Sequence, residues 1–361
     1  MIDKRVILVT GVAGYWGARV AARLAEQPGF HVIGLDVEPP RDTSCQDVDL
    51  IQADVRNPLL GELLASENVD TVCHLSFTDS ARPSEASFEA NVMGTMKVCA
   101  ACAQAGVRKV VLKSSTAVYG AHPDNSAFLT EEHSLRGSQR YGYSRDMVQI
   151  ETFANGFRRQ EPDIALTILR FPNVVGPRVD TPMTRFLSEP WTPVLLGFDP
   201  LMQVIHEDDV VEALVHSTVD GEQGVYNVAA EGVLPLSKIM ALAGKIGLPV
   251  FHPFAYWGAG LLGGTRLRLS RCVPIELDYI RYSWVADLTK MREVLCFTPH
   301  YTADEALREF AGRHRLSRYR SDSAALSYDE VRLRDTIERR RRARSRQDGV
   351  SLDEEGEEDD D

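Results

Sequence analysis

Short apolar runs alternate with helix-like segments from Lys4 to Tyr119, and this alternation limits the possible folds more than any other feature of the chain. The runs are rich in valine, isoleucine and leucine, as in RVILVTG, HVIGLDV and RKVVLKSS. Segments with helical spacing, about 10 to 20 residues long, separate them. Parallel strands need such crossover segments, which are right-handed and usually helical. The sequence therefore predicts an α/β fold with a doubly wound parallel sheet.

The pattern becomes looser after Tyr141, where a helix to Arg159 and the strand IALTILRFPNVVG are expected. We expect residues 1–178 to form the sheet domain, with a strand and a helix returning to it from residues 203–230. Residues 179–320 carry prolines, aromatic residues and short apolar runs, and we expect a smaller, interleaved C-terminal substrate-binding lobe there. Residues 321–361 hold an arginine-rich run and an acidic block, which predicts a charged, disordered tail.

The composition excludes several classes of protein. With 44% hydrophobic and 25% charged residues, the 361-residue chain is typical of a soluble globular protein. The net charge of −12 argues against a nucleic-acid surface over the whole molecule, and the acidic block competes for the arginines beside it. The longest apolar stretch of the C-terminal half, residues 250–264, is too short for a membrane span of roughly 20 residues. We therefore expect neither a nucleic-acid partner nor a membrane span.

The six cysteines are scattered, and no signal-like segment precedes the apolar run from Val6 to Val9. This favours a cytoplasmic protein without disulfides. Cys99 and Cys102 have the spacing of a metal or redox pair, but no second pair exists and they lie among alanines, so we interpret them as packing residues. The histidines lack the spacing of metal ligands, and we predict no metal site.

Three glycines follow the first strand in VTGVAGYWGARVAARL and stand at the start of a helix. Gly11 permits a tight turn, Gly14 lets a pyrophosphate approach the backbone, and Gly17 lets the helix pack closely on the strand. The free amides and the positive end of the helix dipole then attract phosphate groups. This arrangement predicts a dinucleotide-binding site of the Rossmann type.

The second strand ends at Asp36, about 20 residues further on, where a carboxylate accepts hydrogen bonds from the adenosine ribose. The same carboxylate repels the 2′-phosphate of NADP, and no basic residue follows it directly, so we predict NAD as the cofactor. Asp54 and Val55 follow the next strand and are expected to flank the adenine. Asp54 has an alternative role as a helix cap.

Six further motifs follow in order: CHLS (residues 73–76), NVMGT (91–95), SSTAVYG (114–120), RFPNVVGP (170–177), IHEDDVVEAL (205–214) and ADLTKMREVLCFTP (286–299). With the Gly-x-x-Gly-x-x-Gly loop and the tyrosine helix, they resemble the extended short-chain dehydrogenase/reductase family. That family contains the NAD-dependent epimerases and dehydratases, such as UDP-glucose 4-epimerase. The resemblance covers most of the chain from Ile2 to Phe310.

The resemblance implies a catalytic tyrosine and a catalytic serine. Tyr141 matches the tyrosine of the family's Tyr-x-x-x-Lys motif and would exchange a proton with the substrate oxygen while hydride passes to or from the nicotinamide. Ser115, three positions before the Val-Tyr-Gly of SSTAVYG, would hold and polarise the same oxygen. Taken alone, Tyr141 is equally an aromatic residue on a helix surface, and Ser115 a hydroxyl bonded to its own backbone.

The resemblance also implies further ligand-binding residues and a partner. The cofactor set extends to Tyr15, Trp16, Leu75, Ser76, Asn91, Ser114 and Phe171, together with Tyr141 and Arg145. The substrate set is Thr116, Asn173 and Met202. Asn91 matches a position associated with a proton relay, and it has a second interpretation as a helix cap. The implied partner is a second copy, with helices 89–106 and 141–159 of the homodimer forming a four-helix bundle.

Arg145 stands where the family has lysine. A phenol with a pKa of about 10 needs a nearby cation to act as a base at neutral pH. Arginine also carries a positive charge, but its guanidinium is larger, planar and more rigid than an ammonium group. We expect Arg145 to support the tyrosine with altered geometry, and the alternative is a site that binds NAD but turns over poorly.

Met202 is a second departure, because nucleotide-sugar members of the family usually place an arginine there for the nucleotide phosphates. Its loss weakens the case for a nucleotide sugar. Three other arginines are candidates for the same role: Arg178, Arg185 and Arg281. Four aromatic residues suit an apolar pocket, a core or a dimer contact equally: Phe251, Phe254, Tyr256 and Trp257.

The leading prediction is an NAD-dependent epimerase, dehydratase or dehydrogenase acting on a secondary alcohol of a sugar or nucleotide-sugar derivative. One alternative is a dehydrogenase of an apolar alcohol such as a sterol or terpenoid, favoured by Met202 and the aromatic residues. The other is a catalytically weak NAD-binding regulatory or assembly protein, favoured by Arg145 and the charged tail.

Overall fold

A seven-stranded sheet carries the fold, with its strands in the order β11-β6-β5-β4-β1-β2-β3. The strands are β1 (Arg5–Thr10), β2 (Phe30–Asp36), β3 (Asp49–Gln52), β4 (Thr71–His74), β5 (Lys109–Ser115), β6 (Ala165–Phe171) and β11 (Gly224–Asn227). Every neighbouring pair is parallel. This computed structural model confirms the predicted doubly wound sheet. The strand order reverses between β1 and β4, where sheets of this kind bind ligands at the carboxyl ends of their strands.

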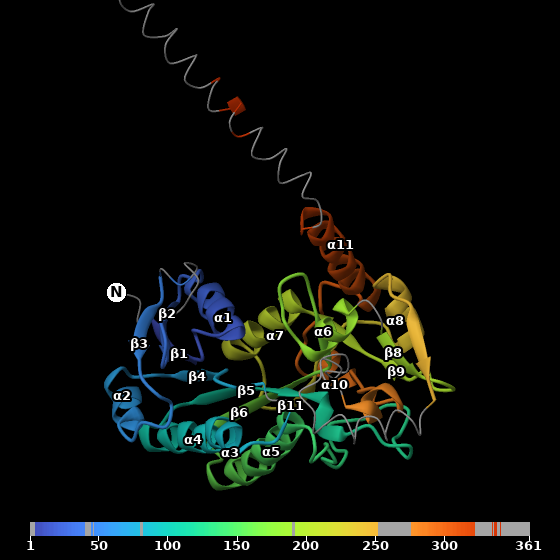
Figure 1. The fold of residues 1–361 in the computed structure, drawn as a ribbon. Coiled ribbons are helices and arrows are strands. Elements are labelled where there is room, and N and C mark those ends of the chain that lie inside the picture. The colour runs from blue at the N-terminus through green and yellow to red at the C-terminus, as the bar shows by residue number, and fades with distance from the viewer. Residues whose placement is uncertain are drawn as a thin grey trace, which may run out of the picture. The chain divides into compact units, whose positions relative to one another are not determined.

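Helices cover both faces of the sheet (Figure 1). Two of them, α1 (Tyr15–Ala25) and α7 (Glu207–Val219), pack on one face. The opposite face carries α2 (Leu60–Ser66), α3 (Glu85–Phe88), a π-helical turn (Glu89–Met93), α4 (Gly94–Ala105) and α5 (Gly142–Gln160). Buried aliphatic side chains fill the space on each side of the sheet. The thiols of Cys99 and Cys102 are free and lie in one of these cores, as the packing interpretation expects.

The smaller lobe is built from short elements around its own apolar core. Its helices are α6 (Pro182–Ser188), α8 (Leu236–Leu242) and the first turns of α11 (Ala303–Ser321). Helix α10 (Thr289–Glu293) packs against β11 of the main sheet, and 3-10 turns lie at Thr116–Tyr119 and Leu277–Ile280. Short strands form three two-stranded sheets among the described residues: β7 (Asn173–Val175) with β10 (Val204–His206), β9 (Leu201–Met202) with β12 (Leu234–Pro235), and β8 (Thr192–Leu195) with β13 (Gly247–Val250). Between these segments α7 and β11 return to the main sheet, within the range 203–230 expected from the sequence.

The structure describes residues 4–39, 45, 47–79, 82–189, 192–251 and 276–321, and the isolated positions 334, 336, 337 and 340. Residues 1–311 form one unit and residues 312–361 a second. The expected disordered tail after Ser321 lies almost entirely outside the described residues, as do Phe254, Tyr256 and Trp257. Within the described parts, no helix combines the length and the apolar character needed to cross a membrane.

Two helix termini bear directly on the site. Helix α5 begins at Gly142, so Tyr141 is its N-cap residue and stands just outside the helix, while the Arg145 amide closes the first turn on the Tyr141 carbonyl at 3.0 Å. Helix α7 begins in the IHEDDVVEAL motif, with three acidic residues in its first turn. Acidic side chains there interact favourably with the positive end of the helix dipole.

Candidate active site

The glycine loop is shaped by close backbone approaches between β1 and α1. Gly11 has φ +79°, and a Cβ there would lie 2.7 Å from the Leu75 carbonyl oxygen. A Cβ on Gly17 would meet the Gly11 carbonyl oxygen at a distance no real contact allows. Gly14 is the N-cap of α1, without a side-chain cap and without acidic residues in the first turn. The helix terminus therefore leaves amides that suit an anionic group.

A groove beside this loop collects the residues predicted to hold the adenosine half of a dinucleotide. It is lined by Gly11, Gly14, Asp36, Asp54, Val55, Leu75 and Ser76. Asp36 is fixed at the end of β2, because its Oδ2 accepts a hydrogen bond from the Ala13 amide (2.9 Å) and its Oδ1 accepts one from the Val37 amide (2.7 Å). The carboxylate thus lies between the glycine loop and the ribose side of the groove.

Arg56 lines the same groove and was not anticipated from the sequence. Its guanidinium binds the Asp54 carboxylate at 2.6 Å, and these hydrogen bonds lower the pKa of Asp54. The arginine follows Asp54 by two positions, a spacing that signals a local ion pair at a turn. Arg56 is therefore neutralised by its neighbour in this groove.

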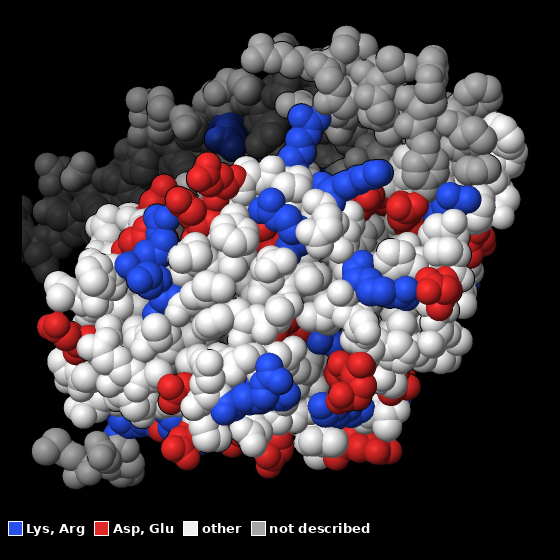
Figure 2. Space-filling model, turned by 90° about the horizontal axis from the view of Figure 1, so that it is seen from below, with Lys and Arg blue, Asp and Glu red and all other residues white. Residues whose placement is uncertain are grey.

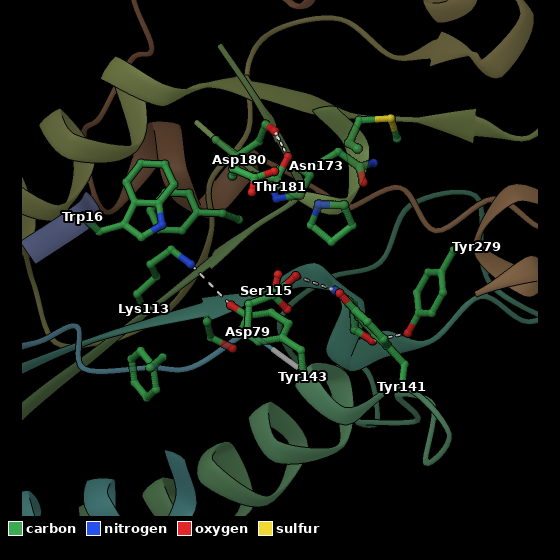
Figure 3. Close-up of a pocket in the computed structure, with 18 of the residues that line it drawn as sticks. Trp16, Asp79, Lys113, Ser115, Tyr141, Tyr143, Asn173, Asp180, Thr181 and Tyr279 are labelled. Atoms are coloured by element: carbon green, nitrogen blue, oxygen red, sulfur yellow. Dashed lines mark hydrogen bonds between the residues drawn. The ribbon is translucent and has the colours of Figure 1, made fainter. Parts of the chain in front are cut away.

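A second cavity adjoins the groove, since Leu75 and Phe77 border both. Its wall brings together predicted site residues from four separate parts of the chain: Trp16, Ser114, Ser115, Tyr141, Phe171 and Asn173. Figure 3 labels Trp16, Ser115, Tyr141 and Asn173 among them. The structure adds residues that the sequence did not single out: Asp79, Lys113, Tyr143, Asp180, Thr181, Tyr279 and Trp284. Ser115 and Tyr141 thus face one cavity at the end of the cofactor groove.

Tyr141 lies at the wall of this cavity among other aromatic rings. Its ring centroid is 6.4 Å from that of Tyr143 and 6.5 Å from that of Tyr279. Burial raises the pKa of Tyr141 well above its usual value, and the negative charge of Asp79 raises it further, while Arg185 opposes the change. These surroundings favour the protonated phenol, the form of Tyr141 that can donate a proton.

Ser115 is the last residue of β5, and alternation along the strand separates it from its neighbour. Ser114 turns to the other side and donates a hydrogen bond to the buried Glu151 carboxylate at 2.5 Å. Ser115 Oγ accepts a hydrogen bond from the Ala117 amide at 3.2 Å and borders the cavity. Thr116, the next residue, is buried, and it is not among the described residues that line the cavity.

Arg145 points away from the cavity. Its Nε and Nη2 donate hydrogen bonds to the Asp146 carboxylate at 3.0 and 2.7 Å, and Nη2 also donates to the Ser84 carbonyl at 3.2 Å. Asn91 binds the second oxygen of Asp146 and both backbone groups of Thr78. Among the described residues, those lining the two cavities include neither Arg145 nor Asn91.

Lys113 is the cation that the wall presents instead. It precedes Ser115 by two positions on β5, so both side chains lie on the same side of the strand. The Lys113 ammonium is 3.3 Å from the Tyr143 hydroxyl and 5.5 Å from the centre of the Trp16 ring. This period of two in KVVLKSS is the sequence signal that would have found it.

The residues predicted for the substrate lie in different places. Asn173 lines the cavity, and its amide donates to the Gln203 carbonyl at 3.2 Å. Met202 is buried in the apolar core of the smaller lobe. Arg178 pairs with Glu207, and Arg281 stacks on Phe198.

Two more predicted residues are not among the described residues that line the cavity. Arg185 binds Asp180 of the cavity wall at 2.6 Å, so this candidate phosphate-binding arginine contacts the wall directly. Tyr15 lies on the α7 side of the glycine loop, where its hydroxyl accepts a hydrogen bond from Arg19 at 3.0 Å.

Comparisons with known proteins identify the family of the chain. A family model for the NAD dependent epimerase/dehydratase family matches residues 7–229. The chain belongs to this family. An uncharacterized protein of Mycobacterium tuberculosis is 36% identical over 318 residues, covering 86% of this chain and 84% of the relative. A UDP-glucose 4-epimerase of Mycolicibacterium smegmatis is 30% identical over 272 residues, covering 68% of this chain and 85% of the relative.

Solved structures share the fold. The structure of MoeE5 in complex with UDP-glucose and NAD is 26% identical, with a TM-score of 0.63, and covers 86% of this chain and 99% of its own. A UDP-glucose 4-epimerase from Thermotoga maritima with UDP-glucose has a TM-score of 0.65 at 20% identity and the same coverage. These matches confirm the extended short-chain dehydrogenase/reductase architecture.

The residues of this epimerase/dehydratase family member fit the cofactor of the family. The tight approaches at Gly11 and Gly17 keep the loop free of side chains where phosphates would lie. The uncapped N-terminus of α1 offers amides, and the Asp36 carboxylate offers acceptors for ribose hydroxyls. The groove therefore suits a dinucleotide without a 2′-phosphate, which is NAD.

Proposed function

We propose that the protein is an NAD-dependent epimerase or related oxidoreductase that acts on a secondary alcohol of a nucleotide sugar. The observation that carries the proposal is the meeting of Ser115 and Tyr141 at one cavity, directly beside the cofactor groove. The Mycolicibacterium relative is named as a UDP-glucose 4-epimerase, and the MoeE5 structure contains UDP-glucose and NAD. Both relatives support a sugar nucleotide as the substrate class.

Residues of the chain can carry out the proton transfer that such a reaction needs. When bound, NAD would supply the acceptor for the hydride of the carbinol carbon. The hydroxyl proton of the alcohol leaves at the same time, so that the carbon–oxygen bond becomes a carbonyl. In the proposed mechanism Ser115 holds this oxygen, and Tyr141 takes the proton as the phenolate in oxidation and returns it as the phenol in reduction. The raised pKa of Tyr141 favours the form that returns the proton.

The wall of the cavity suits a sugar. Asp79, Asp180, Thr181 and Asn173 offer polar groups to hydroxyls, and Arg185 beside Asp180 offers a positive charge. The same wall carries aromatic rings at Trp16, Phe77, Phe171 and Trp284. These rings, with Met202 in the lobe, favour the second candidate, a dehydrogenase of an apolar secondary alcohol.

Turnover assays separate the candidates. The purified chain with NAD is incubated with UDP-glucose, UDP-glucuronic acid and apolar secondary alcohols, and both NADH formation and the 4-epimer of each sugar nucleotide are measured. Epimerisation or NADH formation with a sugar nucleotide, lost in Tyr141→Phe, supports the proposal. Turnover confined to apolar alcohols supports the second candidate. NAD binding without turnover on the whole panel, unchanged in Tyr141→Phe, would leave only the regulatory alternative.

We further propose a homodimer through helices α4 and α5. Figure 2, which views the face carrying these helices, shows a broad area without charged side chains. The exposed residues of this face include one charged residue on α4, Lys97, and five uncharged ones, Met93, Ala100, Gln104, Gln149 and Thr152. Light scattering after size-exclusion chromatography should give twice the chain mass. Ala100→Arg should yield monomers, whereas the matched change Ala241→Arg on α8 should not.

A further inference from the structure

Lys113 occupies a position in the active-site wall that no other described lysine shares. It lies on the Ser115 side of β5, and Figure 3 shows its side chain extending beneath Trp16 toward the Tyr143 hydroxyl. The ammonium is 3.3 Å from that hydroxyl and 5.8 Å from the centre of the Tyr143 ring. A lysine so placed brings a positive charge to the cavity shared by Ser115 and Tyr141.

The residue that the sequence motif would use for this charge is engaged elsewhere. Arg145 forms an ion pair with Asp146 at 2.7 Å, and Asp146 is fully buried. Turning the guanidinium toward the cavity would leave this carboxylate without its charged partner, which is costly for a buried charge. The Arg145 side chain also lies over the Phe88 ring at 5.7 Å, which fixes it further. Arg145 is therefore held in a structural pair.

The other charges of the cavity wall make a cation at Lys113 important. Asp79 and Asp180 both border the cavity, and Arg185 is bound to Asp180. A phenol that gives up its proton in this setting gains a negative charge beside carboxylates, and only a nearby cation offsets that repulsion. Arg185 opposes part of the rise in the pKa of Tyr141, but it is itself bound to Asp180. Lys113 adds a second positive charge in the cavity wall, 3.3 Å from the Tyr143 hydroxyl, and the Tyr143 ring is 6.4 Å from that of Tyr141.

The geometry points to Lys113 as the cation of the active site, in place of the residue four positions after Tyr141. One N–H of its ammonium binds the Tyr143 hydroxyl, which holds the ammonium in the cavity wall, and its positive charge offsets the negative charge that develops on Tyr141. An ammonium has three donors, so two remain for hydroxyls of the nicotinamide ribose. Lys113 is then a catalytic residue and Tyr143 a positioning residue. This inference rests on the proposed function, because it assigns the charge used in the proposed proton transfer.

A labelling experiment tests the place of Lys113 without any turnover. The full chain is methylated reductively at its lysines, with and without saturating NAD, and the modified peptides are quantified by mass spectrometry. NAD should slow the labelling of Lys113 several-fold and leave Lys238, an exposed lysine of α8, unchanged. Labelling of Lys113 that NAD does not slow would overturn the inference.

Binding and kinetics test its role. Lys113→Met should weaken NAD binding about tenfold, the size expected for a lost hydrogen bond from a charged group. With UDP-glucose as probe, kcat should fall about 100-fold, as for loss of proton-transfer support, while KM changes little. Lys113→Arg should recover part of kcat, Tyr143→Phe should lose part of it, and Lys238→Met serves as the matched control. Circular dichroism and the Tm confirm that each variant folds.

The outcomes separate this inference from the proposed function. If the wild-type chain turns over no sugar nucleotide or alcohol, the proposed function fails, and the labelling and NAD affinity still decide whether Lys113 faces the cofactor. If the wild type is active and Arg145→Met loses kcat as Tyr141→Phe does while Lys113→Met does not, the inference is wrong and the proposed function stands.

Discussion

The Arg145 guanidinium is bound to the carboxylate of Asp146, its neighbour on α5, through Nε at 3.0 Å and Nη2 at 2.7 Å. The other oxygen of Asp146 accepts a hydrogen bond from Asn91 at 3.0 Å. Asn91 in turn bonds both backbone groups of Thr78, in the segment that follows β4 and borders the cofactor groove. The arginine that replaces the motif lysine therefore takes part in holding α5, the helix at residue 91 and the groove together.

Arg145→Met is expected to lower the free energy of unfolding by about 1–3 kcal/mol, because it removes a charged partner from a buried carboxylate. Arg145→Lys should lose less, since it keeps the charge but not the forked contact. Urea unfolding measures both. The double variant Arg145→Met with Asp146→Asn should recover part of the loss, since no buried charge then remains. Equal stability of Arg145→Met and wild type would contradict the structural role.

Asp36 should determine the preference for NAD over NADP. Its carboxylate is held by the Ala13 and Val37 amides at the end of β2. Asp36→Ser removes the charge that repels a 2′-phosphate and the acceptors for the ribose, so NAD affinity should fall about tenfold or more. Calorimetric titration with both cofactors measures the change.

Releasing Arg56 should add to this effect on cofactor preference. Asp54 is the nearer of the two carboxylates that Arg56 contacts, at 2.6 Å against 3.8 Å for Glu89, so Asp36→Ser with Asp54→Asn removes the main competitor of a phosphate for this guanidinium. We expect tighter NADP binding in the double variant than in Asp36→Ser alone. An unchanged ratio of NAD to NADP affinity in both variants would show that the ribose contacts lie elsewhere.

The features that depend on local pattern were predictable from the sequence. The sheet follows from the spacing of apolar runs, and the glycine loop from three residues that must lack a Cβ, two of which the structure shows in close backbone contact. The convergence of Ser115 and Tyr141 depended on a resemblance in motif order. Each of these signals can be read along the chain without knowing how its elements pack.

The features that depend on packing were not predictable. The direction of Arg145 follows from the buried Asp146 and from Ser84 in a distant segment. The burial of Met202 depends on how the smaller lobe closes over β9. The alternation of side chains along β5 could have placed Lys113 on the same side as Ser115. Its contact with Tyr143 could not be predicted, because it joins two elements whose relative placement is not encoded in the local sequence.

Arg170 and Glu151 form a buried ion pair on the side of β5 opposite Ser115. Arg170 Nη2 is 2.6 Å from Glu151 Oε2, and Ser114 donates to the same carboxylate. Breaking a buried pair by removing one partner costs about 3–5 kcal/mol, so Arg170→Met should be strongly destabilised in urea unfolding. Arg170→Met with Glu151→Met should be more stable than the single variant. If the double variant is less stable than Arg170→Met, the ion pair stabilises the fold by more than the cost of leaving the Glu151 carboxylate buried without a partner.

His74 should make the fold sensitive to mild acid. Burial lowers the pKa of His74 to about 3, and the ring is bonded to Thr10 through Nδ1 at 2.7 Å and to Thr95 through Nε2 at 3.2 Å. The unfolded chain takes up a proton below a pKa of about 6.5, whereas the folded chain resists it until about 3. The stability that the neutral ring supports is therefore complete above pH 6.5 and is lost as the pH falls from there toward 3. The loss of stability from this group is at most about 1.4 kcal/mol per pH unit.

Urea midpoints between about pH 7 and pH 5 measure this loss, before most carboxylates titrate. His74→Gln should start from a lower stability and show a flatter pH dependence, and an equally steep dependence in that variant would assign the acid sensitivity to other groups.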